Sequence, residues 1–362
     1  MNLTLGKRLR ELPGPIMITG HTGFKGTWLT FLLERLNVPV VGLSLSPEKG
    51  SLFDRAKRTD SIREAFLDIR KATAVAQFMA KHQPSAIIHM AAQPLVLESY
   101  KTPRETFETN VMGTVNVLDS AFKIDSVKAI IVVTTDKVYR NDNSRQAFVE
   151  TDSLAGKDPY SASKVGTESV VAAWQHIAKV SGGPKIISVR AGNVIGGGDW
   201  AENRLLPDLI RSFMSGEPIN IRNPRSTRPW QHVLDPLSGY LLALEHSLKT
   251  DSTDAFNFGP DSKSLSVKKI AEIAVRAWPF PTKVDSFRIV TANESESLSL
   301  ALDSEKARRI LHWTSAWTQK EAVVATIEWW DDVLNNGTDP VGACAQDIEF
   351  ALKNINRLSN HD

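Results

Sequence analysis

The sequence predicts an α/β protein built on a doubly wound parallel sheet, with a second, smaller and mixed region toward the carboxyl end. Short apolar runs, typical of strands covered on both faces, alternate with helical stretches through residue 190. A glycine-rich turn joins the first strand to the first helix. After residue 190 the helical stretches are separated by segments rich in Pro, Gly and Asn. We therefore expect one domain over residues 1–190 and another over 191–362, some segments of which return to the first.

The first strand is predicted at residues 16–19 and the first helix at residues 28–36. Between them, Gly20, Gly23 and Gly26 recur at every third position. The first glycine allows a tight turn, the second lets the backbone approach a pyrophosphate, and the third lets helix pack on strand. An anion is favoured at the amino end of the helix. A plain strand-to-helix turn is the alternative, but this placement favours a dinucleotide site formed by Gly20, Thr22, Gly23, Phe24, Lys25 and Gly26.

The second strand is predicted at residues 38–45, and its end carries Ser44 and Ser46 rather than an acidic residue. A carboxylate at this position would bind the ribose 2′-hydroxyl of NAD, so the sequence alone does not separate NAD from NADP. Lys25 and Lys49 are candidate neighbours of a 2′-phosphate.

Two further segments are candidates for contact with a dinucleotide. Asp68 and Ile69 lie in a loop before a helical run at residues 75–81, beside an adenine ring or simply in solvent. The strand at residues 86–90 ends in Ala91 and Ala92, whose small side chains let a loop pass close to the cofactor.

The remaining elements continue the same alternation. Thr102-Pro103 predicts the start of a helix that runs to residue 122, by the rule that a capping residue precedes proline. Its mid-helix Asn110 needs partners if it is buried. The other elements are expected as strands at 129–133 and 186–190, helices at 159–180, 205–214, 237–248, 267–277 and 320–334, and a loose helical tail at 339–362.

Composition narrows the class of protein. A net charge of +2 gives no broad cationic field, which argues against nucleic acid as a partner. The single cysteine, Cys344, excludes an internal disulfide and a cysteine-rich metal site, and we expect no metal. Residues 1–11 lack the apolar segment of a signal peptide, and no run of about 18 apolar residues predicts a membrane span. We therefore expect a cytoplasmic enzyme with no membrane partner.

Tyr160 and Lys164 are the candidate catalytic pair. They stand four residues apart on a predicted helix, so both project from one face. A nearby ammonium favours the phenolate, which makes Tyr160 a candidate general base and leaves Lys164 able to hold a nicotinamide ribose. Thr135 and Asp136 follow the strand at 129–133, at the edge where ligands of open α/β sheets bind. A surface Tyr-Lys pair is the alternative that these neighbours disfavour.

These motifs resemble those of a known family. Residues 19–26 (TGHTGFKG), 134–139 (TTDKVY) and 160–164 (YSASK) are similar to the extended short-chain dehydrogenase/reductases. Residues 190–200 (RAGNVIGGGDW) and 228–233 (RPWQHV) more narrowly resemble the CDP-glucose 4,6-dehydratases. The resemblance covers about residues 14–330 and implies an NAD-binding Rossmann domain with a smaller nucleotide-sugar-binding domain.

The resemblance also implies a redox-neutral dehydration of CDP-glucose to CDP-4-dehydro-6-deoxyglucose and water. Tyr160 takes the C4 hydroxyl proton while NAD accepts the C4 hydride, and Thr135 positions O4. The resulting ketone acidifies C5–H, so a base removes this proton and protonated Asp136 protonates the leaving C6 hydroxyl. The hydride then returns to C6.

Lys137 departs from the related TDP-glucose dehydratases, which have glutamate after the aspartate. It becomes a C5 base only if burial or Lys164 lowers its pKa, and otherwise it orients water or sugar or pairs with Asp136. Arg228 is expected to clamp the diphosphate, because a guanidinium matches phosphate oxygens in a fork. Further candidates for the nucleotide sugar are Asn193, Arg204 and Trp230, and Trp200 either stacks or packs.

Two other functions remain open from the sequence. A nucleotide-sugar 4-epimerase shares Tyr160 and Lys164 but needs no acid at Asp136. A non-catalytic dinucleotide sensor has no need of the tyrosine, lysine, threonine and aspartate together. The helices that begin at Pro103 and Pro159 have apolar residues on more than one side, which predicts a homodimer through a helical bundle.

Overall fold

The computed structural model describes residues 5–142, 147–218, 220–280, 288–289 and 299–359. Its centre is a seven-stranded sheet in the order β11-β6-β5-β4-β1-β2-β3, in which all neighbouring strands are parallel. The strands are β1 (Ile16–Thr19), β2 (Val40–Ser44), β3 (Arg63–Phe66), β4 (Ala86–His89), β5 (Ala129–Val133), β6 (Lys185–Ala191) and β11 (Ala255–Phe258). The chain winds outward from β1 in both directions, so the predicted doubly wound class is confirmed.

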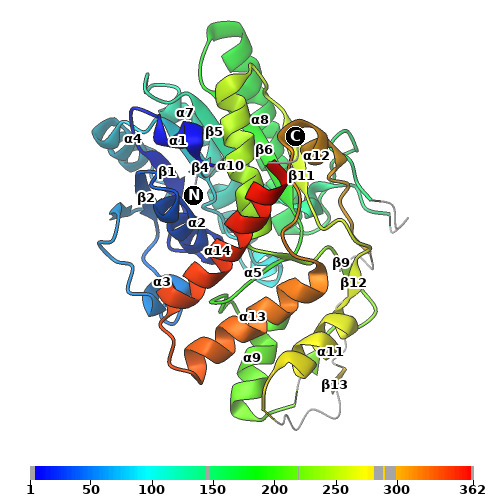
Figure 1. The fold of residues 1–362 in the computed structure, drawn as a ribbon. Coiled ribbons are helices and arrows are strands. Elements are labelled where there is room, and N and C mark those ends of the chain that lie inside the picture. Colours follow the sequence, from blue (N-terminus) through cyan, green and yellow to red (C-terminus); the bar gives the residue numbers. More distant parts are fainter. Residues whose placement is uncertain (1–4, 143–146, 219, 281–287, 290–298, 360–362) are drawn as a thin grey trace.

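Helices cover both faces of this sheet (Figure 1). Alternation along β1 explains how, because Ile16 and Ile18 pack in one apolar cluster and Met17 in the other. One face is covered by α2 (Phe24–Arg35) and α10 (Leu234–Lys249), and the other by α4 (Ala72–His82), α7 (Gly113–Ala121) and α8 (Pro159–Ser181). The two layers hold the carboxyl ends of the strands at one edge, where the candidate site lies.

Two strands of the sheet differ from the sequence-based expectation. β3 was not predicted because its sequence, Arg-Glu-Ala-Phe, is half polar, and the structure places it as a partly exposed edge strand. β11 lies beyond residue 190 yet pairs with β6 from Ala255 to Phe258. The α10 helix before it also packs on the sheet. Both elements therefore contact the central sheet although they lie beyond residue 190.

The predicted helix from Pro103 is interrupted. It consists of α6 (Pro103–Phe107), the π-helical segment η1 (Glu108–Met112) and α7. Thr102 occupies the N-cap position before Pro103, as expected, but its side chain makes no capping bond, because its hydroxyl donates to the Glu98 carbonyl of the preceding helix α5 (Val96–Lys101). Asn110 is buried but fully engaged: its amide bonds to the backbone of Gln93 and to the Ser163 hydroxyl.

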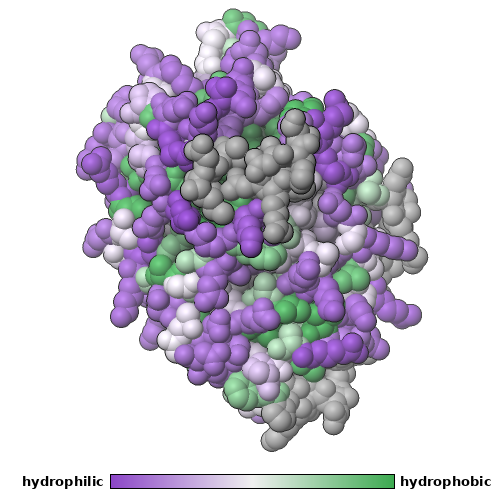
Figure 2. Space-filling model, in the orientation of Figure 1, coloured by the Kyte–Doolittle hydropathy of each residue, from purple (hydrophilic) through white to green (hydrophobic). Residues whose placement is uncertain are grey.

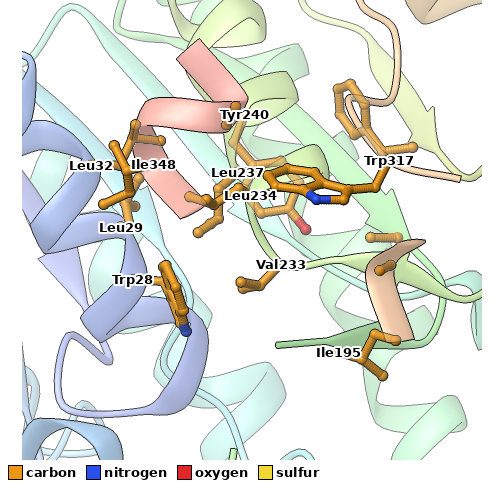
Figure 3. Packing of buried hydrophobic residues seen from close by; sticks show 14 of the residues in the cluster. Trp28, Leu29, Leu32, Ile195, Val233, Leu234, Leu237, Tyr240, Trp317 and Ile348 are labelled. Carbon is orange, nitrogen blue, oxygen red and sulfur yellow. The ribbon is translucent and has the colours of Figure 1, made fainter. Parts of the chain in front are cut away.

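The remaining helices form the smaller region around α9 (Leu205–Ser215), α11 (Val267–Ala277) and α13 (Gln319–Leu334), with α12 (Glu305–Leu311) against β11. The segment expected to be a loose helical tail is helical, as α14 (Pro340–Ser359), but it is not loose, because it packs on α2, α10 and α13. Cys344 and Ile348 on α14 are buried, and Figure 3 shows Ile348 facing Leu29 and Leu32 of α2. The looseness was wrongly expected because the segment is mostly polar, and its apolar residues, which recur three and four positions apart and form one face of the helix, were not recognised.

The motif Gly196-Gly197-Gly198 has a packing role that its sequence did not indicate. The Trp28 indole of α2 donates to the Gly197 carbonyl at 2.9 Å. A Cβ at Gly197 would lie 2.0 Å from the Trp329 ring of α13, so only glycine fits between the two. The loop thereby joins α2, at the start of the fold, to the smaller region.

No helix among the described residues is long and apolar enough to cross a membrane. Polar residues dominate the face in Figure 2, and the apolar ones occur in small groups.

Candidate active site

The glycine turn forms a cradle that fits a pyrophosphate. Gly20 adopts a φ of 79°, and a Cβ there would lie 2.8 Å from the Ala91 nitrogen. A Cβ at Gly26 would lie 2.1 Å from the Gly20 carbonyl oxygen. Gly23 is exposed, and the nearest atom to a Cβ there is the Gly20 oxygen at 3.4 Å. The α2 helix begins at Phe24 without a side-chain cap, so this open glycine and the helix N–H groups offer an anion site.

At the end of β2, hydroxyl groups stand where an acidic residue is usual. The Thr22 and Ser44 hydroxyls lie 2.7 Å apart, and the Thr22 hydroxyl also reaches the Leu45 carbonyl at 3.0 Å. Lys49 is exposed in the loop that follows. Lys25 does not face this end, which corrects its expected place near a 2′-phosphate: its ammonium donates to the Tyr240 hydroxyl at 3.2 Å.

The other cofactor candidates lie around this cradle. The Ala91 nitrogen donates to the Thr19 hydroxyl at 3.2 Å, and Ala92 beside it is half-buried. The Asp68 carboxylate follows β3 and accepts bonds from Arg70, which lower its pKa. Ile69 does not offer its side chain to a ligand, because that side chain is buried in the core against Gly113.

The catalytic candidates come from two neighbouring elements. Thr135 follows β5 and caps the short 3-10 helix η2 (Asp136–Val138), which carries Asp136 and Lys137. Tyr160 and Lys164 lie in the first turns of α8, whose start is held by the Asp158–Ser161 capping box. The Lys164 ammonium donates to the Val133 carbonyl at 3.0 Å.

The side chains of these two elements meet. The Thr135 hydroxyl donates to Asp136 Oδ1 at 3.1 Å, while Asp136 Oδ2 is buried without a hydrogen-bond partner. Burial raises the pKa of Asp136 to about 6, although Lys137, Thr135 and Arg228 act to lower it. Burial also raises the pKa of Tyr160 to about 12, a hydrogen bond with Thr135 opposes this, and the charge of Asp136 adds to it. The phenol and the carboxyl therefore lie near each other, with the Thr135 hydroxyl in contact with both.

The charge state of the pair differs from the expectation that Lys164 would favour the Tyr160 phenolate. Burial dominates both groups, because it raises the pKa of Tyr160 and lowers that of Lys164 to about 8. Lys25 brings a further ammonium near Lys164, Arg204 and Asp136, and burial lowers the pKa of Lys25 to about 7. From the sequence, Lys25 was expected only at the cofactor, since its place in the glycine turn does not show that it reaches Tyr240 on α10.

The four nucleotide-sugar candidates fall into different places. Arg228 is buried and its charge acts on Asp136. Arg204 bonds Asp199 at 3.1 Å and faces Tyr160, whose pKa its charge lowers. Asn193 is half-buried, and its carbonyl accepts from the Gln231 nitrogen. The expected contact of Trp230 with the nucleotide sugar is corrected, because Trp230 is buried in the core and its indole donates to the Leu265 carbonyl.

A pocket with a mixed polar and apolar lining adjoins the catalytic turn on the side of Lys137. Its lining includes Lys137, Tyr139, Lys157, Asp158 and Arg228. Its three positive side chains suit an anionic molecule, and Val96, Ala155 and Leu300 supply apolar contacts. Among the described residues, no group of three or more His, Cys, Asp or Glu side chains is arranged to hold a metal ion.

A buried ionic network supports the site and was missed by sequence analysis. The Arg190 guanidinium binds both oxygens of Glu168, at 2.7 and 2.9 Å. Glu168 also accepts from the Thr134 hydroxyl at 2.6 Å, and Arg190 donates to the Tyr139 hydroxyl at 2.9 Å. The position of Glu168 four residues after Lys164 was the available signal, because it puts both on one face of α8.

This combination defines a class: a dinucleotide-binding enzyme with a tyrosine-lysine pair and an adjacent acid at the carboxyl edge of a parallel sheet. The model of the NAD dependent epimerase/dehydratase family matches residues 16–259. The chain belongs to this family, and the cofactor of the family is NAD.

Similar proteins of known function support the assignment to this family. The chain is 39% identical over 325 residues to a CDP-glucose 4,6-dehydratase of Salmonella typhimurium, covering 87% of this chain and 89% of that protein. It is 27% identical to a dTDP-glucose 4,6-dehydratase of Shigella flexneri, over 89% of this chain and 96% of that one. The structure of a dTDP-glucose 4,6-dehydratase from Streptomyces venezuelae, with NAD bound, matches with a TM-score of 0.77 at 22% identity, covering 90% of this chain and 99% of that one.

Proposed function

We propose that this protein is an NAD-dependent CDP-glucose 4,6-dehydratase, a lyase that converts CDP-D-glucose to CDP-4-dehydro-6-deoxy-D-glucose and water. One observation carries the proposal beyond the family: the buried carboxyl of Asp136 lies near the Tyr160 phenol, and the Thr135 hydroxyl contacts both. A 4-epimerase needs the tyrosine but no acid at residue 136. The similarity to the Salmonella enzyme supports the choice of CDP-glucose.

The cofactor and the substrate would use the two sides of the site. We assign the cofactor to Gly20, Thr22, Gly23, Phe24, Lys25 and Gly26, with Asp68, the Ile69 backbone, Ala91 and Ala92 at the adenosine end and Tyr160 and Lys164 at the nicotinamide end. Residues 1–190 would mainly bind NAD and residues 191–362 mainly the nucleotide sugar. Arg228, Arg204 and Asn193 are the groups that would hold this second ligand.

Each step follows from the groups that face the sugar. Tyr160 accepts the C4 hydroxyl proton, with Thr135 holding O4. NAD, held by the glycine turn and by Tyr160 and Lys164, would supply the redox chemistry as acceptor of the C4 hydride and as its donor to C6, and C5 would regain a proton in that last step. Removal of the C5 proton next to the new ketone, for which the neutral amine of Lys137 is the candidate base, drives elimination. Asp136 donates its proton to the leaving C6 hydroxyl, since burial keeps the pKa of this carboxyl near 6.

The test is mass spectrometry of products from CDP-, TDP-, UDP- and GDP-glucose incubated with the purified protein and NAD. We expect CDP-glucose to give a product one water lighter, which absorbs in alkali as a 4-ketone does. A product of unchanged mass would indicate the epimerase, and a different preferred nucleotide would correct the substrate. Turnover of any of the four excludes a non-catalytic sensor.

We also propose a cytoplasmic homodimer formed through α6, η1 and α8. Large apolar side chains on or beside these helices are exposed, namely Tyr100, Phe107, Met112, Ile177 and Val180. Pairing them with a second copy would remove this apolar area from water. Light scattering at micromolar concentration is expected to give twice the chain mass, and a monomer would reject the proposal.

A further inference from the structure

Trp200 is the meeting point of two segments that are far apart in the sequence. The Arg55 guanidinium lies 5.0 Å from the centre of the Trp200 ring and 5.4 Å from that of Trp330. Arg211 of α9 also lies 5.0 Å from the Trp200 ring, and Trp330 packs against it at 5.0 Å. Contacts between a guanidinium and an indole are among the stronger cation–π interactions.

The Arg55 side of this contact belongs to the cofactor end. Arg55 closes the short helix α3 (Leu52–Arg55), which follows the loop after β2. That loop starts at Ser44, where the second strand of a doubly wound sheet meets the cofactor ribose. The Arg55 side chain donates to the Gly50 carbonyl at 2.8 Å, and a Cβ at Gly50 would lie 3.6 Å from the Trp200 ring. The end of this loop therefore packs against Trp200 through Gly50 and Arg55.

The Trp200 side of the contact belongs to the reacting end. Asp199, beside Trp200, is buried and bonds the Arg204 guanidinium at 3.1 Å. Arg204 in turn faces Tyr160. Arg211 holds the intervening backbone through the Trp200 and Ala201 carbonyls. One loop therefore carries both the tryptophan that meets the cofactor end and the arginine that meets the catalytic phenol.

We propose that Arg55 and Trp200 are positioning residues: their contact links the loop at the cofactor end to the loop that places Arg204 beside Tyr160. NAD binding, by ordering the first loop, would then favour the arrangement in which Arg204 receives the nucleotide sugar. The two ligands would bind cooperatively, and each would strengthen the other by the same factor. This inference rests on the proposed function for the identity of the nucleotide and for the places of the two ligands.

The first test measures the dissociation constant of CDP, a non-reacting part of the substrate, by calorimetry with and without saturating NAD. We expect NAD to tighten CDP binding about 5-fold or more in the wild-type protein. Trp200→Leu and Arg55→Met should bring this ratio close to unity, while Trp200→Phe, which keeps a ring for the guanidinium, should restore part of it. Arg309→Met, at an exposed position on α12, removes the same charge and should leave the ratio unchanged.

The second readout is the pH profile of kcat, which loosened packing alone does not shift. The groups whose charges act on the Tyr160 phenol are Asp136, Asp158, Arg204 and Tyr240. Arg204 favours the phenolate, so its displacement in Trp200→Leu should move the rising limb of the profile to higher pH. If Trp200→Leu and Arg55→Met keep the wild-type coupling ratio and an unshifted pH profile, the inference is overturned. It is also overturned if NAD does not tighten CDP binding in the wild-type protein.

The proposed function is tested separately by wild-type turnover. If another nucleotide sugar is preferred, its nucleoside diphosphate replaces CDP in the same measurement. Failure of the substrate assignment and failure of the coupling are then distinct results.

Discussion

Asp136→Asn should abolish most of the dehydration while leaving C4 oxidation nearly intact. A general acid contributes about 10²–10⁴-fold to a step of this kind, and an amide cannot supply its proton. Single-turnover experiments with CDP-glucose should therefore show reduced nicotinamide accumulating in the near ultraviolet and little deoxy product by mass spectrometry. Tyr160→Phe is the matched control, because it should block oxidation itself. Equal loss of oxidation in Asp136→Asn would contradict the separate roles given to the phenol and the carboxyl.

The same substitution should stabilise the fold above neutral pH. Burial raises the folded-state pKa of Asp136 from 3.8 to about 6, so its favourable contribution is complete below 3.8 and is lost as the pH rises through about 6. A shift of about 2 units corresponds to about 3 kcal/mol at most. Chemical denaturation at pH 8 and pH 4 checks this: Asp136→Asn should gain free energy of unfolding at the higher pH relative to the lower. An equal effect at pH 8 and pH 4 would show that folding does not raise the pKa of the Asp136 carboxyl.

Arg190→Met should cost about 3–5 kcal/mol of unfolding free energy, the largest stability effect we expect from one surface-distant polar residue. The guanidinium and Glu168 are both nearly fully buried, so the substitution leaves a carboxylate without its cation inside the protein. Arg190 also lowers the pKa of Glu168. The loss should therefore shrink as the pH falls, because protonation of Glu168 removes the unpaired charge. Urea denaturation at several pH values measures both effects.

Two variants make this test specific. The double substitution Glu168→Leu and Arg190→Met should regain part of the loss, since a buried ion pair replaced by apolar side chains is often nearly neutral. Lys123→Met breaks the exposed Lys123–Asp119 pair of α7 and should have no measurable effect. A comparable loss at both sites, or a loss in Arg190→Met that does not depend on pH, would show that the network does not act through buried charge.

Periodicity and glycine spacing were sufficient to predict five of the seven strands of the sheet, together with the turn and the helix that carry the site candidates. Strand β5 was predicted at its observed residues, because all five of its side chains are apolar and buried on both faces. The Asp158-Pro159 start of α8 was equally clear, since the capping box is a local feature. The predictions failed where the local pattern was weak. The half-polar edge strand β3 was not predicted, and α14 was expected as a loose helix although one of its faces is buried.

The sequence by itself determined that a glycine turn, a tyrosine-lysine helix and an acidic turn follow buried parallel strands, because each of these depends on residues close together in the chain. Only the tertiary structure decided what surrounds them. It turned Lys25 toward Tyr240, buried Trp230 in the core, and joined Arg55 to Trp200. It also decided the charge states at Tyr160 and Asp136, because burial outweighs any charge that sequence spacing reveals.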